Sequence, residues 1–145
     1  MRKLTSLLAA GAVCALALAA LSLASVRTTV WTAALSSGQE VPKQVVRDTA
    51  AHGLFKGTLS GHTLRWRLTF AKLTGPAMQA HIHKGARGVS GPIVVGLCAP
   101  CKNGQTGTAT ISATLLKDFA KHLLYVNVHT AKNPDGEIRG QLARG

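Results

Sequence analysis

The chain has 145 residues, and its 17 lysines and arginines against five acids give a formal net charge of +12. These basic residues are scattered along the chain, and the sequence has neither zinc-finger spacing nor aromatic residues interleaved with the basic ones. Positive charge is then the sole argument for nucleic-acid binding, and we expect no nucleic-acid partner. The sequence also has no Gly-x-Ser-x-Gly motif, no carboxylate pair on adjoining strands and no phosphate-binding loop, which argues against hydrolases and kinases.

The amino terminus indicates export. Met1-Arg2-Lys3 is a short basic start, and residues 4–26 carry no charge. This pattern is typical of a secretory signal peptide over residues 1–24, with Ser22-Leu23-Ala24 as the predicted cleavage site. Because the uncharged run is also long enough to cross a bilayer, which takes roughly 20 residues, an uncleaved anchor is the alternative. This segment would be the only part of the chain to enter a membrane. Both interpretations predict an exported protein that is periplasmic, cell-surface or secreted.

The remainder is long enough for one domain. After a short linker at residues 25–29, we predict a single domain over residues 30–143. Without Arg2 and Lys3, the chain has 15 basic residues against five acids, a charge near +10. We expect a basic, soluble surface, whose field could also hold the protein against an anionic envelope.

Short apolar stretches bounded by glycine, proline or asparagine predict about eight strands. Residues 64–70 are the clearest, because four apolar side chains alternate with three polar ones, the pattern of a sheet with one buried face. The other strands are predicted at residues 30–35, 51–59, 78–83, 93–97, 107–112, 124–130 and 137–142. Residues 35–42 predict a bend, and only residues 113–122 have helical spacing. This pattern predicts an all-β antiparallel β-sandwich or flattened barrel with one short helix near residues 113–122.

Two distant segments carry histidines at alternating positions. Residues 80–83 read Ala-His-Ile-His, and residues 125–130 read Tyr-Val-Asn-Val-His-Thr. Alternate residues of a strand share a face, so His81 and His83 point the same way. If the second strand lies beside the first, His129 completes a set of three imidazoles suited to copper or zinc. The alternative is three polar side chains that are hydrogen-bonded to backbone or to Glu137.

The last predicted strand carries Glu137 close to this set. Asn133-Pro134-Asp135-Gly136 has turn chemistry, which predicts a hairpin between the strands of His129 and Glu137. In one interpretation, Glu137 accepts the ring N–H of a ligating histidine and fixes its tautomer. In the other, Glu137 pairs with Arg139 on the strand surface, a contact worth less than about 1 kcal/mol.

The remaining histidines and cysteines are interpreted more simply. His52, His62 and His122 have no ligand spacing, and we expect them at the surface. Cys98-Ala-Pro-Cys101 lacks the βαβ setting of thioredoxin-like enzymes. After removal of the signal peptide, which contains Cys14, the two remaining cysteines are too few for a four-thiolate zinc site. In an exported chain we therefore predict a local disulfide between Cys98 and Cys101, with a pair of soft copper ligands as the alternative.

Five motifs together resemble the chordin-type (CHRD) domain family. They are Leu35-Ser-Ser-Gly-Gln-Glu-Val-Pro42, Gly53, Ala80-His-Ile-His-Lys-Gly85 with Gly91-Pro92, Tyr125-Val-Asn-Val-His-Thr130 and Gly136-Glu-Ile-Arg-Gly-Gln-Leu142. They occur in the family's order over residues 30–143. The resemblance implies a Greek-key antiparallel β-sandwich similar to copper/zinc superoxide dismutase. Family members include extracellular animal regulators of growth-factor signalling and many exported bacterial proteins.

The similarity to the dismutase covers its copper site only. His-x-His followed by Val-x-Val-His resembles the copper-binding part of that enzyme, which implies that His81, His83 and His129 are copper ligands. Residues 84–93 contain no histidine or aspartate for a zinc site. Only residues 131–135 separate His129 from the last strand, where the enzyme has a long electrostatic loop. The resemblance therefore implies a copper-only centre.

These observations predict an exported CHRD-domain binding protein with a copper site at three histidines and no turnover. Its partner would be a protein or an envelope component that the sequence does not identify. One alternative is a copper-only redox enzyme similar to superoxide dismutase. The other is a metal-free extracellular protein-interaction module.

Overall fold

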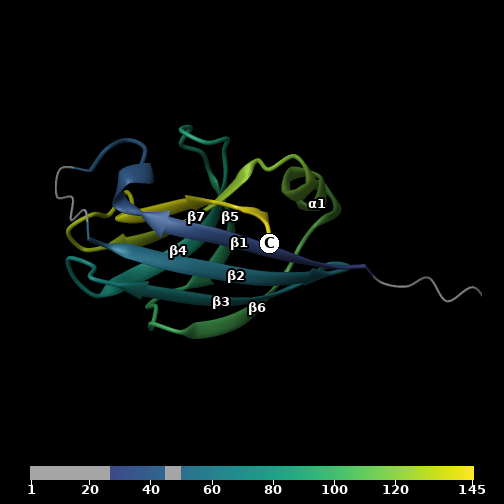
Figure 1. The fold of residues 1–145 in the computed structure, drawn as a ribbon, viewed down its shortest axis with the longest axis horizontal. Helices are drawn as coiled ribbons and strands as arrows, with labels where there is room; N and C mark the ends of the chain where they lie inside the picture. Colours follow the sequence, from purple (N-terminus) through teal and green to yellow (C-terminus); the bar gives the residue numbers. More distant parts are fainter. Residues whose placement is uncertain (1–26, 45–49) are drawn as a thin grey trace, which may run out of the picture.

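The computed structural model describes residues 27–44 and 50–145 (Figure 1). The predicted signal peptide, residues 1–24, lies outside the described residues. Of the linker predicted for residues 25–29, Thr28 and Thr29 already belong to the first strand. Within residues 27–44 and 50–145, no helix has the length and apolar character needed to cross a membrane.

The predicted strands and helix are present, with small shifts at their ends. In chain order the elements are β1 (Thr28–Ser36), the 3-10 turn η1 (Ser37–Gln39), β2 (His52–Ser60), β3 (Thr63–Ala71), β4 (Ala77–Lys84), β5 (Ile93–Cys98), β6 (Gln105–Thr110), α1 (Ala113–Ala120), β7 (Leu124–Thr130), β8 (Ile138–Gln141) and β9 (Ala143–Arg144). Strand β6 ends earlier than predicted because Ser112 caps the helix, its Oγ accepting the Leu115 N–H. The sequence interpretation predicted a bend where the structure has η1, and it missed the shortest strand, β9.

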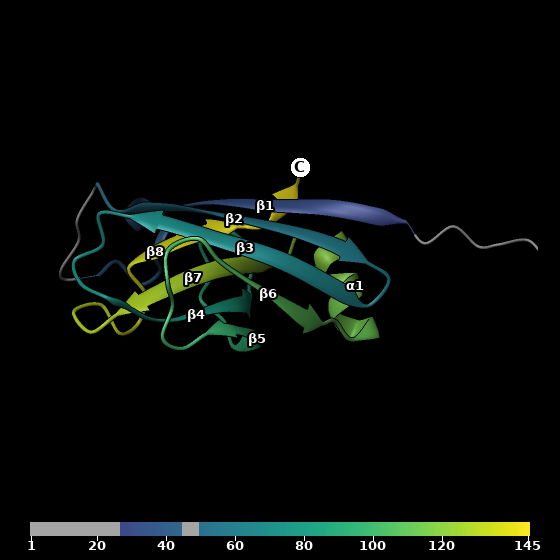
Figure 2. The ribbon, with the colours of Figure 1, turned by 90° about the horizontal axis from the view of Figure 1, so that it is seen from below.

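All strands belong to one antiparallel sheet. Their order is β5-β4-β7-β8-β1-β2-β3-β6, and β9 pairs with β1. The sheet rolls over so that β1, β2 and β3 form one layer and β4, β5 and β7 the other (Figure 2). The two end strands, β5 and β6, are in contact, so the barrel is nearly closed. Because β6 returns to β3 and β7 returns to β4, the connections are those of a Greek key, and the predicted all-β fold is confirmed.

One core lies between the two layers. In β3, Leu64, Trp66 and Leu68 are buried while Arg65 and Arg67 are exposed, as the alternation predicts. Strand β7 behaves differently, because all seven of its residues are buried. The side of β7 that faces away from the core must therefore be covered by other parts of the chain.

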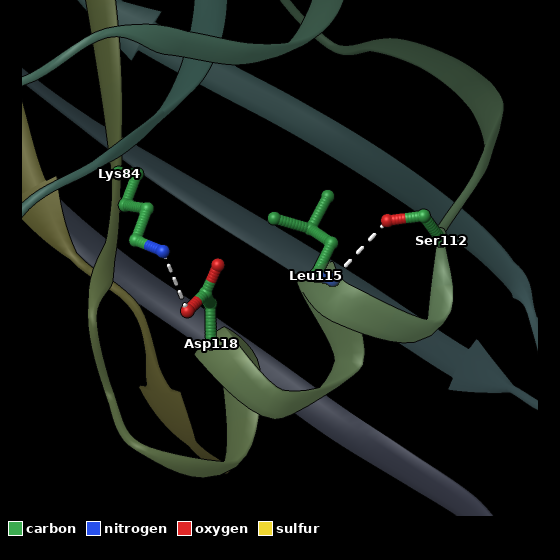
Figure 3. Close-up of polar contacts among 4 residues, drawn as sticks. All are labelled: Lys84, Ser112, Leu115 and Asp118. Carbon is green, nitrogen blue, oxygen red and sulfur yellow. Dashed lines mark hydrogen bonds and ion pairs between the residues drawn. The ribbon is translucent and has the colours of Figure 1, made fainter.

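Helix α1 closes one end of the barrel. Its buried side chains include Leu115 and Phe119, and the Phe119 ring packs against Trp31 of β1 at 5.1 Å between centroids. Lys84 of β4 forms an ion pair with Asp118, a buried residue of the helix, with 3.0 Å between Nζ and Oδ1 (Figure 3). The helix therefore connects β1 to the end of β4 that follows His83.

Candidate metal centre

The three predicted histidines converge on the outer face of β4 and β7. Their candidate ligand nitrogens all lie within 4.8 Å of one another. His81 Nδ1 lies 3.2 Å from His129 Nε2, and the ring centroid of His83 lies 5.6 Å from that of His81. His83 and His129 are 8% and 5% exposed, whereas His81 is partly exposed. The predicted grouping of His81, His83 and His129 is thus present in the structure.

Strand register produces this convergence. Strands β4 and β7 are antiparallel neighbours, and His81 lies opposite Asn127 while Gln79 lies opposite His129. Directly opposite residues share a face, and diagonal neighbours remain within reach of long side chains. Ile82 and Val128 point into the core on the inner face of the sheet. The histidines next to them in sequence therefore point to the outer face.

Backbone carbonyl groups fix the tautomers of two of the rings. His83 Nδ1 lies 2.9 Å from the Gly91 carbonyl oxygen, and His129 Nδ1 lies 2.9 Å from that of Pro134. Because a carbonyl oxygen only accepts, each Nδ1 carries the hydrogen and each Nε2 is unprotonated, and the His129 Nε2 lone pair faces His81 Nδ1. The His83 Nε2 is buried and has no hydrogen-bond partner. The nitrogens that could bind a metal ion are therefore His81 Nδ1, His83 Nε2 and His129 Nε2.

The spacing of these nitrogens suits a metal ion. Metal–nitrogen bonds of ~2.0–2.1 Å at near-tetrahedral angles separate two ligand nitrogens by about 3.3 Å. The 3.2 Å between His81 Nδ1 and His129 Nε2 matches this value. Two such bonds span at most about 4.2 Å, so ring shifts of less than about 1 Å bring the whole set to bonding distance.

Burial keeps the three rings neutral. It is the main cause that lowers the pKa of His81 to about 4, and the neighbouring His129 and His83 lower it further. Burial also lowers the pKa of His83, with a smaller contribution from Arg139, and it lowers the pKa of His129. Neutral imidazole is the form that binds metals, so the site needs no deprotonation at neutral pH.

Tyr125 and Arg139 hold the loop that positions His83. The Tyr125 ring stacks on His83 with 4.9 Å between centroids, and Arg139 Cζ lies 3.5 Å from the centre of the Tyr125 ring. The Tyr125 hydroxyl accepts the Gly91 N–H at 3.1 Å. The Arg139 guanidinium donates to the carbonyl groups of Ala86 and Val89. These contacts fix the residue 85–91 loop, and with it the carbonyl that orients His83.

A buried acid beside this cluster was missed by the sequence interpretation. Glu40 follows η1, is 3% exposed, and accepts a hydrogen bond from Asn127 Nδ2 at 3.3 Å. Burial raises its pKa to about 8, although Asn127 and Arg139 act in the opposite direction. The bend predicted for residues 35–42 is present as η1, but no local pattern distinguishes Glu40 from a solvent-exposed turn residue.

Glu137 has neither of its predicted roles. The predicted hairpin is present, since β7 pairs with β8 and Val128 lies opposite Ile138. The Glu137 carboxylate, however, accepts hydrogen bonds from the Thr74 backbone N–H and from the side chains of Thr74, Thr130 and Asn133. The Nδ1 partners of His83 and His129 are carbonyl groups of Gly91 and Pro134, not Glu137. Arg139 donates to backbone carbonyls instead of pairing with Glu137.

The other predicted residues lie outside the centre. His52, His62 and His122 are exposed, as predicted. Cys98 and Cys101 form the predicted disulfide, with an S–S distance of 2.02 Å, so they are not a pair of free thiolate ligands. Within residues 27–44 and 50–145, the three histidines are the group of His, Cys, Asp and Glu side chains close enough to hold a metal ion.

One comparison with known proteins gave a match. A family model described as the CHRD domain matches residues 31–142. This range extends from β1 to the residue after β8, and it includes all three histidines and both cysteines. Searches of curated proteins and of solved structures found no significant match.

Proposed function

The chain belongs to the CHRD domain family, and from that premise we propose that it is an exported, non-catalytic binding protein that holds one copper ion. The ligands would be His81 Nδ1, His83 Nε2 and His129 Nε2. The observation that carries the proposal is the convergence of these three nitrogens, two of them on rings whose tautomer is fixed by a backbone carbonyl.

The donor set favours copper over other divalent ions. A set of imidazole nitrogens without carboxylates is unsuited to magnesium and calcium, which prefer oxygen. For a given nitrogen site, affinity rises along the first-row metals to copper and falls again at zinc. Three ligands leave at least one coordination position open, and the partly exposed His81 lies nearest to solvent.

Export is supported by the basic start followed by the uncharged run of residues 4–26. It is further supported by the Cys98–Cys101 disulfide, because such bonds persist in oxidising compartments. A location in the periplasm, at the cell surface or in the medium is therefore part of the proposal, together with a protein or envelope partner.

A copper-dependent redox enzyme is the second candidate function. The open coordination position favours it, because redox turnover requires direct access of a small oxidant to the metal. The Greek-key strand order supports a fold likeness to copper/zinc superoxide dismutase as part of this second candidate. Among the described residues, no carboxylate and no fourth histidine joins the three histidines, and this favours binding without turnover.

Copper titration of the full-length protein separates the candidates. We expect one ion per chain, and a loss of affinity of more than about 100-fold in each of H81A, H83A and H129A. The matched control is H122A, which removes an exposed histidine. Stoichiometric binding without superoxide consumption supports the proposal, and turnover that disappears in each of the three variants supports the redox enzyme. If copper does not bind, a metal-free interaction module remains.

A further inference from the structure

A second polar surface lies on the other layer of the barrel, far from the histidines in the strand order. It covers the outer face of β2, β3 and β6 and forms a shallow, open hollow of about 420 Å³. Its polar lining residues are Lys56, Thr58, Arg65, Arg67, Thr106 and Thr108. We name this surface the basic face.

Strand register arranges the basic face in two rows. Arg67 of β3 lies between Lys56 of β2 and Thr106 of β6, and Arg65 lies between Thr58 and Thr108. Directly opposite side chains are ~4.5–5.5 Å apart at Cβ, and residues two apart on a strand are about 6.7 Å apart. Three cations and three hydroxyl groups are therefore spaced a few ångströms from one another.

The cations of the basic face have no counter-charge in the described part of the chain. None of the described acids (Glu40, Asp118, Asp135 and Glu137) lines the hollow, and the described residues form a single ion pair elsewhere, Lys84 with Asp118. Like charges directly opposite on a sheet are destabilising. Lys56 opposite Arg67 is therefore an uncompensated repulsion that a bound anion would relieve.

From this geometry we infer that the basic face binds an acidic polysaccharide chain. Guanidinium groups donate two parallel hydrogen bonds to a carboxylate, and the threonine hydroxyls add donors and acceptors for sugar hydroxyl groups. A row of anions repeated along a chain matches cations repeated along β3. The hollow is shallow and open to solvent, which suits a polymer better than an enclosed small molecule.

Two properties of the basic face argue against nucleic acid. Trp66 borders the hollow but is only 5% exposed, and no large aromatic side chain is exposed among residues 27–44 and 50–145, so single-stranded bases would have no stacking platform. The surface is hollowed and has no protruding helix or ribbon to enter a duplex groove. Charge complementarity therefore points to the polysaccharide.

The test measures binding of fluorescent polygalacturonate oligosaccharides to the full-length protein at several salt concentrations. We expect the triple variant K56Q/R65Q/R67Q to bind at least tenfold more weakly, with a salt dependence shallower by about one unit per cation removed. The matched control K117Q/K121Q/K132Q removes the same charge from exposed residues outside the hollow and should change Kd by less than threefold. Neutral dextran oligosaccharides of equal length should not bind.

Thermal melting verifies that each variant is folded. If the triple variant is not, R65K/R67K decides, because it keeps the charge but loses the planar donor pair, and we expect it to bind more weakly than wild type. The inference is overturned if both triple variants lose affinity equally, if the oligosaccharide does not bind at low salt, or if R65K/R67K binds as wild type does. Tighter binding of a duplex DNA competitor through the same three residues would also overturn it.

Discussion

Two outer faces of one sheet carry polar residues at alternating positions, yet their environments are opposite. On β3, Arg65 and Arg67 are exposed to solvent, whereas on β7 Asn127 and His129 are 3% and 5% exposed. The difference arises from the connections between strands. Strands β2 and β3 are joined by residues 61–62 alone, while residues 85–92 and 131–137 join the strands around the histidines. Connecting segments can turn an outward-facing polar residue into part of a buried site.

We call the outer face of β4 and β7, with the loops packed on it, the covered face. It contains charges and hydrogen bonds that water cannot reach, and the basic face does not. Replacing a polar or charged residue should therefore change the free energy of unfolding strongly on the covered face and weakly on the basic face. The following predictions test this contrast.

The largest effect should come from Glu40. Its pKa rises from 4.5 to about 8 on folding, so the unfolded chain releases the proton first and stability falls as pH rises between these values. At about 1.4 kcal/mol per pH unit, the loss reaches up to about 5 kcal/mol above pH 8. In E40Q this fall should be absent. Urea unfolding from pH 5 to pH 9 measures the free energy of unfolding of E40Q and of the wild type. Because both proteins keep all the histidines, the contribution of the histidines cancels in the difference.

Parallel profiles for E40Q and wild type would show that Glu40 is ionised in the folded protein, which would contradict a pKa raised by burial.

The next effect should come from Glu137, which is 1% exposed and accepts four hydrogen bonds. E137A leaves these donors unsatisfied and should lower the free energy of unfolding by about 3 kcal/mol in denaturant titration. E137Q should remain folded and keep its copper affinity within about threefold, because Glu137 does not contact a histidine. A loss of the ~10–100-fold typical of a ligand's hydrogen-bond partner would restore the predicted role of Glu137.

A smaller effect is expected for Y125F. It removes the hydroxyl that bonds the Gly91 N–H and carbonyl, at a cost of about 1–2 kcal/mol. Because Gly91 orients His83, copper affinity should also fall, by up to about tenfold. The control is T69V on β3, whose hydroxyl bonds Leu54 at the exposed surface and should contribute less than about 0.5 kcal/mol. Equal effects of the two variants would contradict the contrast between the faces.

The smallest effect belongs to the basic face and has the opposite sign. K56E places a carboxylate opposite Arg67 and should raise the free energy of unfolding by about 0.5 kcal/mol. K132E, in an exposed loop, makes the same charge change without a cross-strand partner. If K56E is no more stable than K132E in urea, Lys56 and Arg67 do not repel each other appreciably.

Period-two alternation was sufficient to predict the strands and the side of the sheet that each histidine occupies. It succeeded because the inward positions, such as Ile82 and Val128, must fill a core, which fixes the register of their neighbours. The Cys98–Cys101 disulfide was also predictable, because a pair of cysteines in an exported chain without a redox or zinc setting favours a local bridge.

Contacts between distant loops were not predictable in this way. Glu137 bonds Thr74, 63 residues earlier, and Glu40 bonds Asn127, 87 residues later. Neither pairing follows from a repeat or a local motif, because loops have no periodic constraint that fixes their side chains. The carbonyl partners of His83 and His129 are only eight and five residues away, but they too lie in loops without a periodic pattern.

The most direct test of the metal centre is the number of imidazole ligands on copper bound to the full-length protein. Pulsed electron paramagnetic resonance of the protein loaded with one equivalent of Cu(II) measures this number. The structure predicts three coordinated imidazoles in the wild type, two in H81A, and three in H122A. Fewer than three in the wild type, or an unchanged spectrum in H81A, would contradict a site formed by His81, His83 and His129.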